Sequence, residues 1–88
     1  MSNIESTLKE RGNNYGKFNE HARITIGMKG IVRDAPSFDK MAPYQAEAID
    51  MILHKIGRIV NGDPDYVDSW TDIAGFATLV EKELTSKQ

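Results

Sequence analysis

The stretch QAEAIDMILHKIGRIV, residues 45–60, decides the fold. Placed at about 100° per residue, its apolar side chains fall on one arc of a helix. Pro43 suits the first turn of this helix, and the turn-forming residues 61–64 follow its last apolar position. The pattern therefore predicts an amphipathic helix over 45–60, with an arc made of Ala48, Ile49, Ile52, Leu53, Ile56, Ile59 and Val60.

A second apolar helix follows after a short connection. Asp65 or Asp68 can open it, because acidic residues are favoured at the positive end of a helix. Since the connection is short, we expect the helices over about 45–60 and 68–84 to pack antiparallel as an αα-hairpin. The predicted apolar face of this second helix consists of Trp70, Ile73, Ala74, Ala77, Val80 and Leu84.

The N-terminal half is less regular. A short helix is predicted over 4–11, ended by Gly12, with residues 12–16 forming a turn. Residues 24–28 alternate like a strand, but the length of the 17–34 segment and the lack of a partner strand favour a helix. The chain is therefore expected to be a single all-α domain over 1–88, a small bundle of three to four helices centred on the hairpin.

Composition excludes several classes of protein. The chain has 88 residues, no cysteine and a net charge of −2. Disulfide scaffolds, cysteine-ligated zinc sites and thiol catalysis are excluded, and nucleic acid is not an expected partner because there is no basic surplus. No apolar run approaches the ~20 residues of a membrane span, and the first residues do not resemble a signal peptide. A cytoplasmic protein without membrane contact is expected.

A polar stripe is the first candidate for a functional surface. Four polar residues of the 45–60 helix share one face. The hairpin can bring the C-terminal end of this face near two aspartates of the next helix. The stripe can be a carboxylate cluster that holds Mg²⁺, or a solvated face with one ion pair from Arg58 to Asp68 or Asp72. His54 with Asp50 one turn before it could also form a general base, but no catalytic residue or metal ligand is assigned. The candidate surface comprises Glu47, Asp50, His54, Arg58, Asp68 and Asp72.

The second candidate is the N-terminal segment 11–18. Arg11, Tyr15 and Lys17 could contact a phosphate or a base, and the glycines allow close approach of a ligand. The spacing is not that of a phosphate-binding Walker loop. The alternative is a turn between helices, with Tyr15 and Phe18 packed on the core.

One glycine, at position 75, lies inside the second predicted helix of the hairpin. A helix interior disfavours glycine by ~1 kcal/mol relative to alanine, so Gly75 is expected to allow close packing of a neighbouring helix or ring.

These motifs resemble a family of small proteins encoded by tailed phages and prophages. The resemblance rests on Arg-Gly-x-x-Tyr-Gly-x-Phe at 11–18, Glu-Ala-Ile-Asp-Met at 47–51 and Asp-Ser-Trp-x-Asp-Ile-Ala-Gly-Phe-Ala at 68–77. The resemblance implies a phage origin and a role in the cytoplasm of the infected bacterial host. It also leads us to expect alanine at position 57, where the chain has Gly57. The leading hypothesis is a non-enzymatic helical interaction module of the takeover or anti-defence type, acting on a host or phage protein without a cofactor.

A partial resemblance to MazG-like all-α nucleotide pyrophosphohydrolases gives the alternative. Those enzymes hold Mg²⁺ with acidic motifs on neighbouring helices, which Glu47-x-x-Asp50 and Asp65-x-x-Asp68 are similar to. The resemblance implies a Mg²⁺-dependent pyrophosphohydrolase or a nucleotide-binding protein. Convergence of at least three carboxylates at an open site would favour this alternative, and the sequence leaves the oligomeric state open.

Overall fold

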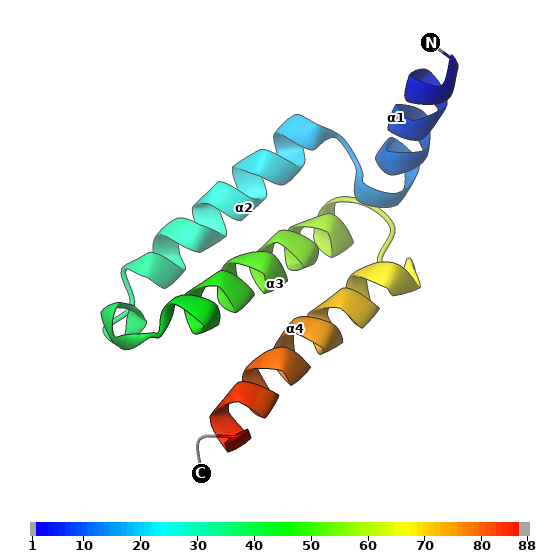
Figure 1. Ribbon diagram of the computed structural model, residues 1–88. Helices are drawn as coiled ribbons and strands as arrows, with labels where there is room; N and C mark the ends of the chain where they lie inside the picture. The colour runs from blue at the N-terminus through cyan, green and yellow to red at the C-terminus, as the bar shows by residue number, and fades with distance from the viewer. Residues whose placement is uncertain (1, 87–88) are drawn as a thin grey trace.

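Residues 2–86 fold into four α-helices. The computed structural model describes residues 2–86, and no strand occurs within them. The expectations of an all-α bundle and of a helix over 17–34 are thereby confirmed. The elements, shown in Figure 1, are α1 (Ser2–Tyr15), α2 (Phe18–Arg33), a 3₁₀ turn η1 (Phe38–Lys40), α3 (Pro43–Asn61) and α4 (Val67–Ser86).

The helix α3 is the centre of the molecule. Helices α2 and α4 flank it and pack against it rather than against each other, while α1 lies at one end of this layer (Figure 1). The radius of gyration is 15.2 Å, whereas a compact chain of this length is expected to have about 12 Å. The molecule measures 50 × 27 × 25 Å and is therefore elongated.

The first helix is longer than predicted. It continues through Gly12 to Tyr15, so the predicted stop at Gly12 and the turn over 12–16 are wrong. The chain turns instead at Gly16, whose φ of +79° is favoured only for glycine. The predicted bounds of the hairpin are close to the observed ones, and Pro43 is the first residue of α3 as expected.

The core is small. In the part of the chain that the structure describes, the only buried apolar side chains are Ala48 and Ile59. The α2–α3 contact buries polar residues instead, chiefly His21 and Thr25. None of the helices within residues 2–86 combines the length and the apolar character needed to cross a membrane.

The packed face of α4 is rotated from the predicted one. Ser69 is buried and Ile73 is half-buried, whereas Trp70 and Ala77 are exposed although the sequence pattern placed them on the apolar face. Only part of the predicted apolar arc is therefore used in packing against α3.

Candidate functional site

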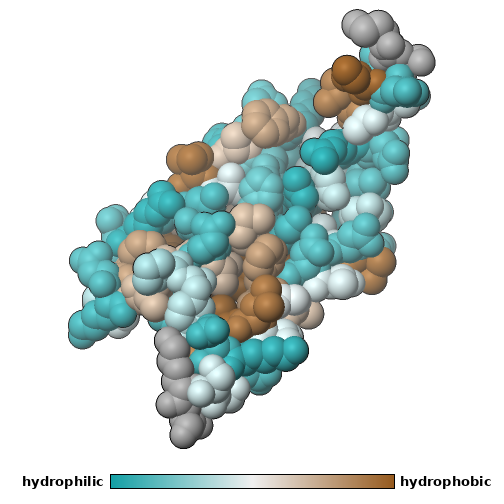
Figure 2. All heavy atoms as spheres, viewed as in Figure 1, coloured by the Kyte–Doolittle hydropathy of each residue, from teal (hydrophilic) through white to brown (hydrophobic). Residues whose placement is uncertain are grey.

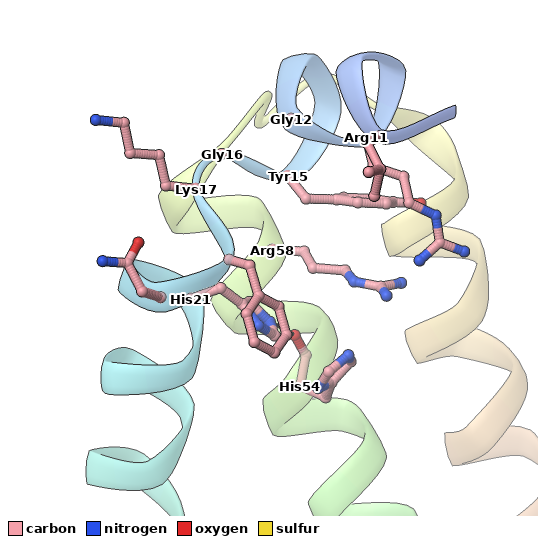
Figure 3. A pocket seen from close by; sticks show the side chains of 11 residues that line it. Arg11, Gly12, Tyr15, Gly16, Lys17, His21, His54 and Arg58 are labelled. Atoms are coloured by element: carbon pink, nitrogen blue, oxygen red, sulfur yellow. Dashed lines mark hydrogen bonds between the residues drawn. The ribbon is translucent and has the colours of Figure 1, made fainter. Parts of the chain in front are cut away.

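A cavity of about 440 Å³ lies where α1, α2 and α3 meet (Figure 3). It joins residues from both predicted candidate sets, which the sequence analysis treated separately. Three come from the N-terminal segment and two from the polar stripe of α3. These five are Arg11, Tyr15, Lys17, His54 and Arg58, and the cavity is called the basic pocket below.

A tight corner at the end of α3 builds the basic pocket. The Asn61 side-chain amide donates hydrogen bonds to the backbone carbonyls of Tyr15 (2.9 Å) and Lys17 (3.0 Å). A Cβ on Gly16 would clash with Asn61, and one on Gly62 would clash with the backbone of Tyr15. The two glycines and the Asn61 amide thus hold the end of α1 against the end of α3. In the sequence, Asn61 and Gly62 indicated only a helix stop.

Arg58 lies over an aromatic ring. The centre of its guanidinium group is 4.2 Å from the centroid of the Tyr15 ring, a cation–π contact. The Tyr15 ring also meets the Tyr66 ring edge to face, with the two centroids 5.7 Å apart and an interplanar angle of 74°. Arg58 therefore belongs to the wall of the basic pocket.

The predicted ion pair from Arg58 to Asp68 or Asp72 is wrong. None of the ion pairs found within residues 2–86 includes Arg58. Lys55, one turn earlier on α3, faces α4 and places its ammonium 3.0 Å from Asp72. A hydrogen bond to Asp68 raises the pKa of Tyr66 to about 12. Among the described residues, the charge of Arg58 is consequently left without a carboxylate partner.

Two imidazole rings form the floor of the basic pocket. His21 is buried, its Nε2 lies 2.9 Å from the backbone carbonyl oxygen of His54, and the two ring centroids are 4.5 Å apart. Burial, together with the charges of His21 and Arg58, lowers the pKa of His54 from 6.5 to about 4, so this ring is neutral at pH 7. The sequence analysis did not identify His21 as a site residue. Its place in the pocket follows only from the packing of α2 against α3, which the sequence pattern does not show.

The acidic residues of the predicted surface do not gather. Asp50 pairs with Arg33 of α2 at 3.1 Å, so it does not orient His54, while Asp72 pairs with Lys55 towards α4. Glu47 is exposed on α3. Among the described residues, no group of three or more histidine, aspartate or glutamate side chains is placed to hold a metal ion. The predicted surface is thus divided between opposite sides of α3.

The basic pocket carries charge of one sign. Its charged lining side chains are Arg11, Lys17 and Arg58, and no carboxylate of residues 2–86 lines it. In Figure 3, Arg11 and Arg58 extend to the same side, whereas Lys17 points away. Two converging guanidinium groups beside an aromatic ring suit the binding of a planar or tetrahedral anion.

Comparison with protein-family models, with curated proteins and with solved structures finds no match to this chain. The two resemblances described above therefore rest on their motifs alone. The chemistry of the basic pocket is the ground for assigning a function.

Proposed function

We propose that the protein is a non-enzymatic binding module that holds an acidic segment of a partner protein in the basic pocket. One observation carries the proposal: every charged side chain that lines the cavity is cationic, although the whole chain has a net charge of −2. Guanidinium groups bind carboxylates through two parallel hydrogen bonds, and Arg58 has no carboxylate partner within residues 2–86.

The surroundings of the pocket favour a peptide over a free anion. Leu8 lines the cavity and is 63% exposed, and Ile4, one turn earlier on α1, is equally exposed. Phe18, also in the lining, is 82% exposed. A small anion would leave these apolar side chains exposed to water. A peptide segment with both acidic and apolar side chains would bury them. The expected partner is therefore an acidic amphipathic segment.

The resemblance to phage and prophage proteins suggests where this partner is found. On that resemblance, the module would act on a host or phage protein in the cytoplasm of the infected bacterium, in a takeover or anti-defence role. The pocket would supply the charge recognition for such a role.

Nucleotide binding is the second candidate, and Phe18 is the observation that favours it. A base could stack on its exposed ring while the phosphates contact Arg11 and Arg58. The hydrolytic form of this alternative requires at least three converging carboxylates, whereas Asp50 and Asp72 pair with different cations on opposite sides of α3. The geometry therefore favours binding over hydrolysis within this alternative.

A titration followed by amide chemical shifts tests the proposal. The ¹⁵N-labelled full chain is titrated separately with a peptide of alternating Glu and Leu, with hexaglutamate and with ADP, at low and at high salt. We expect the Glu–Leu peptide to shift the amides of Gly12, Gly16 and Asn19 and to bind less tightly at high salt. Stronger binding of ADP at these amides would favour the nucleotide alternative, and unchanged amides with all three probes would contradict both.

Charge-removing variants assign the effect to the pocket. Arg11→Gln is expected to weaken binding of the Glu–Leu peptide about tenfold, because a charge-assisted hydrogen bond is lost. Arg23→Gln is the matched control, since Arg23 is exposed on α2 and pairs with Glu20 away from the pocket. Lys17→Gln should have a smaller effect than Arg11→Gln because its ammonium points away from the cavity. Equal losses in Arg11→Gln and Arg23→Gln would mean that only net charge matters.

A further inference from the structure

Helix α4 carries an apolar seam that its own chain only partly covers. Trp70, Ile73, Ala77, Val80 and Leu84 follow the alternating spacing of three and four residues that is typical of helices pairing side by side. Packing on α3 leaves Ile73 and Val80 half-buried, whereas Trp70 is 53% and Leu84 43% exposed. Ala77 at the middle of the seam is also exposed.

A groove runs beside this seam. A cavity of about 370 Å³ opens between α3 and α4, and its lining is apolar except for Gln45. Ala77 and Val80 belong to both the seam and the groove, so the two form one continuous surface. Figure 2 shows apolar side chains gathered along the lower part of this α3–α4 side. The small side chains of Ala48 and Ala77 leave room here for side chains from outside the chain.

The chain as a whole exposes more surface than a compact monomer of its size, which leaves area that a second copy can cover. The surface is 6472 Å², whereas a compact monomer of 9.9 kDa is expected to expose about 5,200 Å². The excess of about 1,300 Å² exceeds the ~800 Å² that each partner contributes to a standard interface, and falls in the range of permanent homodimers. Figure 1 shows α4 at the edge of the helix layer, where a second copy has access to it.

We propose that two copies of the chain pair through the α4 seam, antiparallel about a two-fold axis near Ala77, to form a four-helix bundle from two α3–α4 hairpins. The seam is complementary to itself, because Trp70 and Leu84 lie one heptad on either side of Ala77. A two-fold axis then brings Trp70 of one copy beside Leu84 of the other, as an interface between identical patches requires. The small Ala77 side chains at the axis allow the helices to approach closely.

The residues that flank the seam fit this arrangement. Glu81 lies one turn beyond Ala77, so the two-fold axis separates the two Glu81 carboxylates instead of placing them opposite each other. The Trp70 ring is already fixed, because its Nε1 donates a hydrogen bond to the backbone carbonyl of Pro64 at 2.8 Å. A rigid, exposed tryptophan is a typical anchor of a protein interface. The basic pocket is lined by residues of α1, α2, α3 and the α1–α2 connection and by none of α4, so pairing through the α4 seam leaves it accessible.

The oligomeric state of the full chain tests the proposal. Sedimentation and light scattering are expected to give twice the 9.9 kDa of one chain. Ala77→Glu and Leu84→Glu each place a charge in the seam, and each should weaken self-association at least ~100-fold. Leu79→Glu is the matched control: Leu79 is 63% exposed but lies on the opposite side of α4, so this variant should remain a dimer. Circular dichroism checks that each variant keeps its helical content.

Two results would overturn the proposal. One is a wild-type chain that stays monomeric up to about 1 mM, which would leave no measurable self-association. The other is a dimer that dissociates in the Leu79→Glu variant but persists in a folded Ala77→Glu variant. Pairing would then use the opposite face of α4.

Discussion

The two sides of α3 are packed by different means. On the α2 side, polar and small residues meet closely: His21 and Thr25 are each only 5% exposed, and both lie against Gly57. On the α4 side burial is uneven: Ser69 is only 3% exposed, whereas the larger apolar residues Ile73 and Val80 remain half-buried. An apolar pattern alone therefore does not produce a fully buried contact between two helices. Gly57 lets the backbones of α2 and α3 approach each other, and the side chains between them are then well buried. The apolar side chains of α4 that α3 leaves half-buried can still contact another chain.

The two buried polar side chains of α2, those of His21 and Thr25, have hydrogen-bond partners. The Thr25 hydroxyl donates to the backbone carbonyl of His21 at 3.0 Å, within its own helix. Its methyl group is therefore the part that faces Gly57. The His21 ring reaches the carbonyl oxygen of His54. Burial of a polar group costs little free energy only when the group is hydrogen-bonded. The contact between α2 and α3 can therefore exclude water although its residues are polar.

The largest expected loss of stability comes from apolar burial on α3. Ile59 is 9% exposed and is one of two buried apolar side chains in the described part of the chain. Ile59→Ala is expected to lower the free energy of unfolding by ~2–5 kcal/mol, through lost burial and the cavity left behind. Urea denaturation measures the change. Val60→Ala is the control, because the neighbouring Val60 is 64% exposed and should lose less than ~0.5 kcal/mol. Similar losses in both variants would contradict the assignment of Ile59 to the core.

Gly57→Ala tests the α2 side of α3 directly. A Cβ at position 57 would lie 2.6 Å from the Thr25 methyl and 3.0 Å from the His21 ring. The alanine that sequence reasoning expected here is therefore predicted to destabilise the fold, by ~1–3 kcal/mol as in other overpacked cores. Urea denaturation again gives the value. Combining the substitution with Thr25→Ser, which removes the methyl but keeps the hydroxyl, should restore part of the loss. Absence of both the loss and the rescue would show that α2 and α3 are further apart.

The α2 side of α3 should also make stability depend on pH. Burial, and the charges of His21 and Arg58 around the ring, lower the pKa of His54 in the folded protein to about 4, below its ordinary value of 6.5. The folded state therefore disfavours the protonated ring, and the contribution of His54 is present above pH 6.5 and lost as the pH falls towards 4. Between pH 7 and pH 5 we expect a loss of about 1 kcal/mol, after a discount for solvent screening.

The measurement compares wild type with His54→Gln by urea denaturation at pH 7, 6 and 5. Both proteins share the titration of the carboxylates, so the difference between their curves isolates His54. The variant should lose less stability than the wild type over this range. Parallel pH dependences would show that the ring is as readily protonated in the folded state as in the unfolded one.

The sequence predicted the helices better than it predicted their contacts. The spacing of apolar residues correctly predicted the two helices of the hairpin. The length of the 17–34 segment correctly favoured a helix over a strand. The end of α1 was missed because Gly12 and Gly16 are equivalent in local sequence. Only the contact of Gly16 with Asn61, 45 positions later, decides between them.

The site was only half predictable for the same reason. Arg11, Tyr15 and Lys17 were identified from residue type, and Arg58 and His54 from their shared helix face. Their meeting in one pocket depends on how α1 folds back onto the end of α3, which no local pattern encodes. The choice of an acidic partner for Arg58 failed because the Tyr15 ring occupies the space beside it.

The smallest expected effect is a gain in stability. It is expected from a glycine-to-alanine substitution in α4, at Gly75. The sequence predicted close packing at Gly75, but a Cβ there would meet nothing within 4 Å. Because alanine is favoured over glycine inside a helix, Gly75→Ala should raise the free energy of unfolding by ~0.5–1 kcal/mol, opposite in sign to Gly57→Ala. Urea denaturation of the two variants side by side measures the contrast. Gly75 lies on the far side of α4 from the Ala77 seam, so pairing of two chains through that seam leaves the expectation unchanged. A loss of stability in Gly75→Ala would mean that another chain packs closely on this face, which would contradict both the open surface at Gly75 and the proposed seam.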